Sequence, residues 1–160
     1  MSAIEQMPYD ARVWVYQSKR ILSDAEVNII KKSGTDFIVG WAAHGANLKA
    51  SFDVVYNRFI VIAVDEKQAA ASGCSIDKSV RFVKELDQQF DLNLFDRLQV
   101  AYRIENEIKS CHLSEFEKLA AQNIVDGSTI VFNNMVSNKT DFDKQWEIPL
   151  KKSWQSRVLT

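Results

Sequence analysis

One cysteine of the chain stands where a thiol could be reactive. Cys74 opens an amphipathic segment that we expect to be a helix, directly after an apolar run and a stretch of small residues. The free amide groups at a helix start stabilise a thiolate, and Lys78, one turn further on, would add to this effect. With His44 as general base, the pattern indicates a thiol-dependent enzyme with Cys74 as nucleophile. The alternative is an inert, buried Cys74 that only contributes to packing.

The same helix start could hold an anion. Gly73 would let the backbone approach a ligand closely, and Ser75, Lys78 and Ser79 supply hydroxyl and ammonium groups within the first turns. Helix N-termini present unpaired N–H groups and a positive dipole, so phosphate or carboxylate groups bind there readily. The sequence therefore predicts a site for a small anionic ligand, with helix capping by Ser72 or Ser75 as the structural alternative.

The elements that would position these residues follow from hydrophobic patterning. Ser23–Glu26 is a capping box, which predicts the start of a helix. Two apolar runs, Ala11–Gln17 and Phe59–Val64, lack a polar face and indicate strands buried on both sides. Leu48–Tyr56 and Leu98–Ile104 instead alternate, as edge strands do. This order predicts an α+β fold with a ferredoxin-like βαββαβ core, an antiparallel sheet covered by two helices.

In such a core, three connections lie at one end of the sheet: the loop before the second strand, the turn after the third and the exit of the fourth. His44 lies in the first connection, Cys74 follows the second, and Cys111 and His112 follow the third. We therefore expect both histidines and both cysteines at one rim. Their spacing matches no zinc motif, so we expect no metal and no cofactor.

We expect a single domain over residues 1–160, because a chain of this length buries a sufficient core without disulfides or metal. The predicted core covers about residues 11–106. A C-terminal extension, about 107–160, begins with a second capping box at Ser114–Glu117 and continues with a strand at Thr129–Phe132. Trp146 and Trp154 should dock this extension on the core.

Composition limits the classes of partner. Twenty lysine and arginine residues balance twenty-one acidic ones, for a formal net charge of -1, so no overall field attracts nucleic acid. Phe59–Val64 also lacks the aromatic signature with which RRM-type sheets stack bases, so nucleic acid is not an expected partner. No apolar run of about twenty residues predicts a membrane span. Two cysteines without a disulfide spacing indicate a reducing, cytoplasmic compartment, and the edge strand Leu48–Tyr56 could pair in a homodimer.

Five strings along most of the chain carry a resemblance: Asp10–Gln17, Tyr56–Val61, Ala71–Ser79, Thr129–Asn133 and Trp146–Leu150. In these strings the chain resembles a family of small bacterial proteins of uncharacterised function, whose members often carry the name ABC transporter ATPase. The resemblance implies a grouping and brings no catalytic residues with it.

The residues themselves argue against ATPase chemistry. Gly40–Asn47 has the two-glycine spacing of a P-loop, but Ala46 and Asn47 stand where Lys and Ser or Thr would contact phosphate and Mg²⁺. The leading hypothesis is instead a small-ligand, anion-binding or protein-interaction module with its site at the Cys74 helix start. The thiol-dependent enzyme with His44 as base is the alternative.

Overall fold

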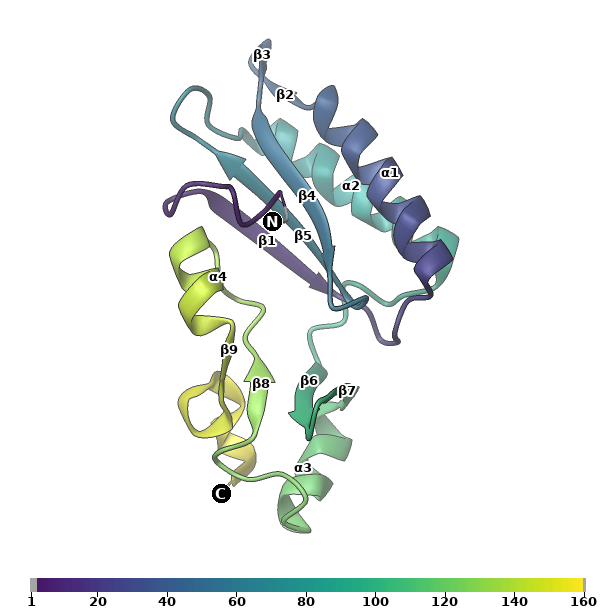
Figure 1. The fold of residues 1–160 in the computed structure, drawn as a ribbon, viewed down its shortest axis with the longest axis vertical. Helices are drawn as coiled ribbons and strands as arrows, with labels where there is room; N and C mark the ends of the chain where they lie inside the picture. The colour runs from purple at the N-terminus through teal and green to yellow at the C-terminus, as the bar shows by residue number, and fades with distance from the viewer. Residues whose placement is uncertain (1–2, 160) are drawn as a thin grey trace.

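The computed structural model describes residues 3–159 as helices and antiparallel sheets, so the predicted α+β class is confirmed (Figure 1). The strands are β1 (Arg12–Gln17), β2 (Ala42–Ala43), β3 (Ala46–Asn47), β4 (Lys49–Val55), β5 (Phe59–Asp65), β6 (Gln99–Ile104), β7 (Glu107–His112), β8 (Ile130–Phe132) and β9 (Glu147–Pro149). The helices are α1 (Asp24–Val39), α2 (Gly73–Phe90), α3 (Leu113–Ala121) and α4 (Lys139–Gln145), with short 3₁₀ helices η1 (Leu150–Lys152) and η2 (Trp154–Leu159). Within residues 3–159, no helix is both long enough and apolar enough to cross a membrane.

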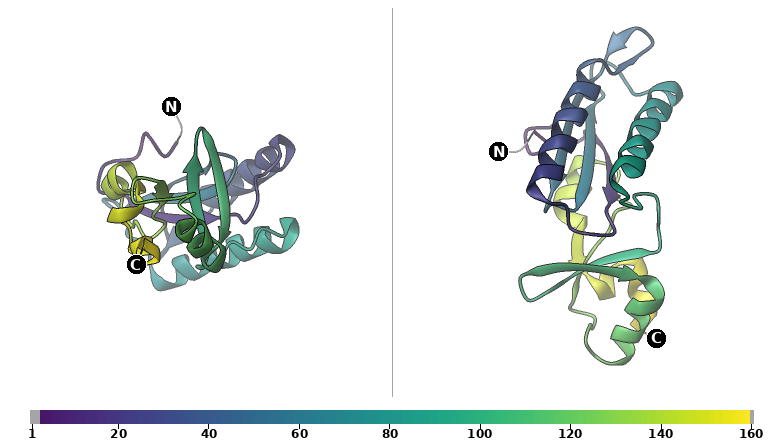
Figure 2. Two further views of the ribbon diagram at one scale, coloured as in Figure 1. Left: turned by 90° about the horizontal axis from the view of Figure 1, so that it is seen from below. Right: turned by 90° about the vertical axis from the view of Figure 1, so that its right-hand side faces the viewer.

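β5 is the centre of the first sheet, whose strand order is β1-β5-β4 with antiparallel pairing throughout. All its residues are buried, as its continuous apolar run predicts. Ile60 and Ile62 belong to the core under α1 and α2, whereas Phe59 and Val61 face the opposite side. Figure 2 shows the two helices side by side along this sheet. Both faces of the central strand are therefore covered.

Both long helices start at capping boxes. The Ser23 hydroxyl accepts the Glu26 N–H, and the Glu26 carboxylate accepts the Ser23 N–H at 3.0 Å, so the predicted start of α1 is confirmed. Ser72 and Ser75 form an equivalent reciprocal pair at the start of α2. These caps fix where each helix leaves its preceding loop.

The second sheet has the strand order β7-β6-β8-β9 and lies below the first in Figure 1. Val100 and Tyr102 of β6 pack with Phe116 of α3 and with Leu150 of η1 in a core of their own. Val100 and Tyr102 therefore pack against α3 and not against α1 or α2, and Ala101, on the other face of β6, is also buried, so the expectation of an edge strand with one buried face was wrong.

A third apolar cluster lies between the two sheets. Val13 and Phe59 of the first sheet pack with Phe132 and Trp146 of the C-terminal region. Trp146 is 4% exposed, so its predicted docking is confirmed. Trp154 is 39% exposed, and the docking prediction was wrong for this residue.

The ferredoxin-like arrangement is present only in its first three strands. β6, the expected fourth strand, pairs with β7 and β8, so β1 is an edge strand and the prediction of a central β1 was wrong. One reason is that β6 finds a partner after the short Glu105–Asn106 turn, where loop closure costs little entropy. A second reason is that residues 137–139 already bond to part of the free edge of β1. The Val13 N–H donates to the Ser137 carbonyl at 3.0 Å, and the Lys139 N–H donates to the Ala11 carbonyl at 2.8 Å.

Candidate functional site

The predicted anion site at the start of α2 is largely engaged in capping the helix. Ser75 is 1% exposed, and its hydroxyl accepts the Ser72 N–H at 2.7 Å and donates to the Ser72 carbonyl at 2.9 Å. Ser79 is 2% exposed, and its hydroxyl donates to the Ile76 carbonyl at 2.6 Å. Both hydroxyl groups therefore have partners inside the helix.

Gly73, Cys74 and Lys78 are the predicted site residues on α2 that are exposed to solvent. A Cβ atom added at Gly73 would meet nothing within 4 Å, so the backbone there is open. A carboxylate of the protein already lies beside this helix start, because Glu66 Oε2 accepts the Ala71 N–H at 2.8 Å. Anion binding by this turn stays a prediction.

His44 lies at the same end of the fold as Cys74. It occupies the turn of the β2–β3 hairpin, with a left-handed φ of 52°. Trp41, directly before the hairpin, donates its indole N–H to the Ser75 carbonyl at 2.8 Å, which holds the hairpin against the start of α2. His44 and Cys74 are both exposed, and no hydrogen bond joins them in the part of the chain that the structure describes.

Cys111 and His112 lie on β7 in the second sheet, away from that hairpin (Figure 1). The prediction that all four residues share one rim was therefore wrong, because it depended on β6 joining the first sheet. Burial raises the pKa of the Cys111 thiol. His112 Nδ1 accepts the Ser114 N–H at 3.1 Å and caps α3, so the predicted capping box at Ser114–Glu117 was also wrong.

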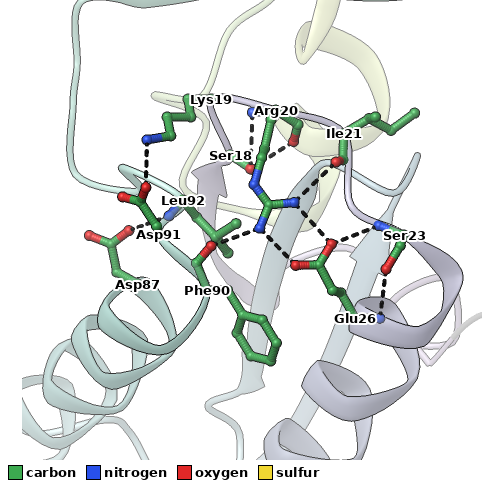
Figure 3. Close-up of polar contacts among 10 residues, drawn as sticks. All are labelled: Ser18, Lys19, Arg20, Ile21, Ser23, Glu26, Asp87, Phe90, Asp91 and Leu92. Atoms are coloured by element: carbon green, nitrogen blue, oxygen red, sulfur yellow. Dashed lines mark hydrogen bonds and ion pairs between the residues drawn. The ribbon is translucent and has the colours of Figure 1, made fainter.

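A polar cluster ties the start of α1 to the end of α2 (Figure 3). Arg20 donates from Nη1 and Nη2 to the two carboxylate oxygens of Glu26 at 2.9 and 2.7 Å, and from Nη2 to the Phe90 carbonyl at 2.7 Å. Arg20, together with the Ser23 N–H, lowers the pKa of Glu26 to about 2. The Arg20 and Glu26 charges neutralise each other, so this cluster offers no reactive group. Its hydrogen bonds join the start of α1 to the end of α2 and thereby fix the two helices.

The seam groove is a cavity beside the junction of the two sheets, with a volume of about 400 Å³. Its lining comes from the N-terminal segment at Ile4 and Glu5, from the second half of β4, from α4 and from the start of β9. It includes Tyr56, Lys139, Phe142, Asp143, Trp146 and Glu147. A volume of this size is in the range of small-molecule sites. The groove is therefore a candidate binding site assembled from distant segments.

Glu147 is the polar centre of the groove wall. Its Oε1 accepts the Arg103 Nε–H and its Oε2 accepts the Tyr56 hydroxyl, each at 2.7 Å. The Arg103 guanidinium also lies over the Tyr56 ring, 4.9 Å from its centroid. Partial burial is the largest cause that raises the pKa of Tyr56, and the hydrogen bond to Glu147 is the second. The tyrosine hydroxyl therefore stays protonated at neutral pH and is held in one position.

Trp146 forms the apolar wall of the groove. Its ring stacks on Phe142 at a centroid distance of 4.6 Å and lies nearly parallel to Tyr56 at 5.8 Å. On α4, the buried ammonium of Lys139 donates to the Asp143 carboxylate at 2.6 Å. The groove thus combines an aromatic surface with a phenol, carboxylates and an ammonium group, which suits a ligand with both apolar and polar parts.

Sequence patterning did not identify this groove. Tyr56 belongs to a predicted edge strand, and Trp146 is predicted only to dock the C-terminal extension. Tyr56 and Glu147 are 91 positions apart, and such a separation carries no geometric information. The one available signal was the string Trp146–Leu150, which joins an aromatic residue to an acidic one.

Comparison with known proteins adds no family to these observations. No protein-family model, no curated protein and no solved structure matches the chain. Its function must therefore be inferred from the geometry of the seam groove and of the α2 start.

Proposed function

We propose that the protein is a binding module that holds a small organic ligand in the seam groove. The observation that carries this proposal is the aromatic wall of Phe142 and Trp146 beside fixed polar groups of known direction. An apolar part of the ligand would pack on the Phe142 and Tyr56 rings, which are more exposed than Trp146, and a polar group would bond to the Tyr56 hydroxyl. Specific pockets combine apolar walls with a few placed polar groups in this way.

A second hollow, of about 480 Å³ between α3 and η2, is a weaker candidate. Its lining includes Ala120 and Ala121 and contains no aromatic side chain. Small aliphatic side chains give a ligand less contact area than stacked rings do. The seam groove is therefore the better supported site, although it is the smaller of the two.

Ligand-detected binding at assigned residues tests the proposal. A fragment set with neutral, cationic and anionic members would be titrated into ¹⁵N-labelled protein, and amide and indole N–H shifts would be followed. We expect at least one fragment to give saturable shifts centred on Tyr56, Phe142 and the Trp146 indole N–H. If no fragment shifts these resonances, the seam groove is not a ligand site.

A matched pair of variants controls for nonspecific contacts. Phe142→Ala removes one ring of the groove wall, whereas Phe95→Ala removes a partly exposed ring, at 39% exposure, that does not line the groove. We expect Phe142→Ala to weaken binding of the fragment at least tenfold and Phe95→Ala to leave it unchanged. Equal affinities in both variants would contradict the proposal.

The start of α2 supports a second candidate, a thiol-dependent enzyme with Cys74 as nucleophile and His44 as base. The specific observation is the Trp41–Ser75 hydrogen bond, which keeps the His44 hairpin beside the exposed thiol. Alkylation rates read by peptide mass spectrometry across a pH series would test it. We expect Cys74 to react faster than Cys111 and to slow down in His44→Ala; an unchanged rate in that variant removes His44 from the mechanism.

A homodimer through the β4 edge, a cytoplasmic location and kinship with the bacterial family described above also stay proposals. One contact counts against strand pairing at β4: Asp53 Oδ1 accepts the Val54 N–H at 2.8 Å and pairs with Lys31 at 3.4 Å. A backbone N–H that is already bonded, beside a charged side chain, makes an edge strand less able to pair with a strand of another chain. Sedimentation velocity of the wild type and of Asp53→Ala would test for this dimer. A dimer through β4 should form more readily when the Asp53 carboxylate is removed.

A further inference from the structure

Arg58 is a buried cation in the turn between β4 and β5. It is 7% exposed, and its Nη1 donates to Ser110 Oγ on β7 at 2.8 Å. The same nitrogen reaches the Ser18 carbonyl at 3.5 Å, which is the outer limit of a hydrogen bond. Its Nε and Nη2 atoms have no acceptor among residues 3–159, and neither atom is fully enclosed. Both atoms therefore keep some contact with solvent.

The charge of Arg58 has no counter-charge in the described part of the chain. Among residues 3–159, no carboxylate lies within ion-pair distance of it, and burial lowers its pKa. The charged residue next to Ser18 is Lys19, which has the same sign and is paired with Asp91. A buried charge without a partner is strongly unfavourable, so this position favours the arrival of an anion.

Gln17 carries a second unpaired donor, and its backbone pairs with that of Phe59, the residue after Arg58. It lies one residue from Ser18, whose N–H donates to the Arg58 carbonyl at 2.9 Å. An indole nitrogen can only donate, so Trp146 fixes Asn134 Oδ1 as its acceptor and Asn134 Nδ2 as the donor to Gln17 Oε1 at 2.8 Å. The Gln17 side-chain nitrogen is therefore a donor, and it is buried with no acceptor among residues 3–159.

We propose that Arg58 binds an oxyanion, a phosphate or carboxylate group, where the end of β1 and the β4–β5 turn meet β7. The guanidinium presents Nε and Nη2 as a planar fork that matches two oxygens of such a group. The unpaired Gln17 amide lies on the strand that pairs beside this turn. This site is separate from the seam groove and does not depend on a ligand there.

The test follows the Arg58 side chain itself in the wild-type protein. Nε–Hε resonances of ¹⁵N-arginine-labelled protein would be assigned through bonds and titrated with sodium phosphate and with sodium acetate, against sodium chloride at equal ionic strength. We expect the Arg58 resonance to shift saturably with phosphate or acetate, while those of Arg81 and Arg97 stay unchanged. A phosphate response identifies the phosphate class, and an acetate response identifies the carboxylate class. No saturable shift, or an equal shift with chloride, overturns the proposal.

Thermal unfolding of two arginine variants gives an independent check. Arg58→Met removes the charge at the proposed site, and Arg81→Met makes the same change at an exposed position on α2. Whichever of phosphate and acetate shifts the Arg58 resonance should raise the Tm of the wild type and of Arg81→Met by about 3 °C at saturation. The Tm of Arg58→Met should not change. An equal rise in all three proteins means that the anion acts elsewhere, which contradicts the proposal. The wild-type titration stands even if Arg58→Met does not fold.

Discussion

Gly34 of α1 makes a close approach to β4 that only glycine permits. A Cβ atom added at this position would lie 2.2 Å from Cδ1 and from Cε1 of Phe52. Ordinary contact begins near 3.4 Å, so the ring would have to retreat by about 1.2 Å. Phe52 is 6% exposed and also contacts Phe82 edge-on, 6.0 Å away between ring centroids, so it has little room to move.

Two opposing effects set the size of the change in Gly34→Ala. Alanine in a helix interior gains about 1 kcal/mol over glycine. Overpacking a filled core costs about 1–3 kcal/mol, and the enclosed ring places Gly34→Ala in the upper part of that range. We expect a net loss of about 1–2 kcal/mol in the free energy of unfolding, which lowers the Tm by about 2–8 °C for a chain of this size.

Urea denaturation followed by circular dichroism measures this loss, with Gly40→Ala as the control. A Cβ atom at Gly40 would meet nothing within 4 Å, so we expect a change below about 0.5 kcal/mol there. Phe52→Leu should be less harmful in the Gly34→Ala background than alone, because the smaller side chain relieves the overlap. A Gly34→Ala protein that is as stable as the wild type, or more stable, would refute this reasoning.

Three further outcomes are expected. Arg20 lowers the pKa of Glu26 to about 2 from an ordinary 4.5, so the ionised Glu26 carboxylate stabilises the fold above about pH 4.5, and this stabilisation is lost as the pH falls towards 2. Acid titration of Glu26→Gln should therefore show a smaller loss of stability than the wild type over that interval. Glu147→Gln should lower the pKa of Tyr56 towards its ordinary 10.0 but leave it raised, since burial is the larger cause, as ¹³Cζ NMR titration would show. Ser72→Ala should cost about 1 kcal/mol in urea denaturation through loss of the α2 cap, and no loss would mean that Ser75 alone is sufficient.

Local structure was predictable wherever neighbouring residues decide it. The Ser23–Glu26 capping box predicted the start of α1, because its two hydrogen bonds join residues three positions apart. The β4–β5 hairpin and the full burial of β5 also followed from alternation and from a continuous apolar run. The start of α3 was not predictable in this way, since His112 and Ser114 both have capping side chains and only the exit of β7 selects between them.

Strand pairing over long distances was not predictable from the same patterns. β6 was correctly predicted as a strand, but its apolar face could pack on α1 and α2 or on α3. The proximity of β7 and the contacts of residues 137–139 along β1 decided the choice. That choice also separated Cys111 and His112 from the Cys74 end of the fold.

The sequence by itself determined the two long helices, the strands β1, β4, β5 and β6 and the cap of α1, because these depend on residues within a few positions of one another. It also placed Cys74 at a helix start beside small residues, as the structure has it. Only the tertiary structure brought Tyr56 to Glu147 and Trp146, and left Arg58 buried without a carboxylate from the described residues. The physical reason is that a groove or an unpaired charge is a property of distant segments in contact, and several packings of the same apolar faces satisfy the sequence pattern equally well.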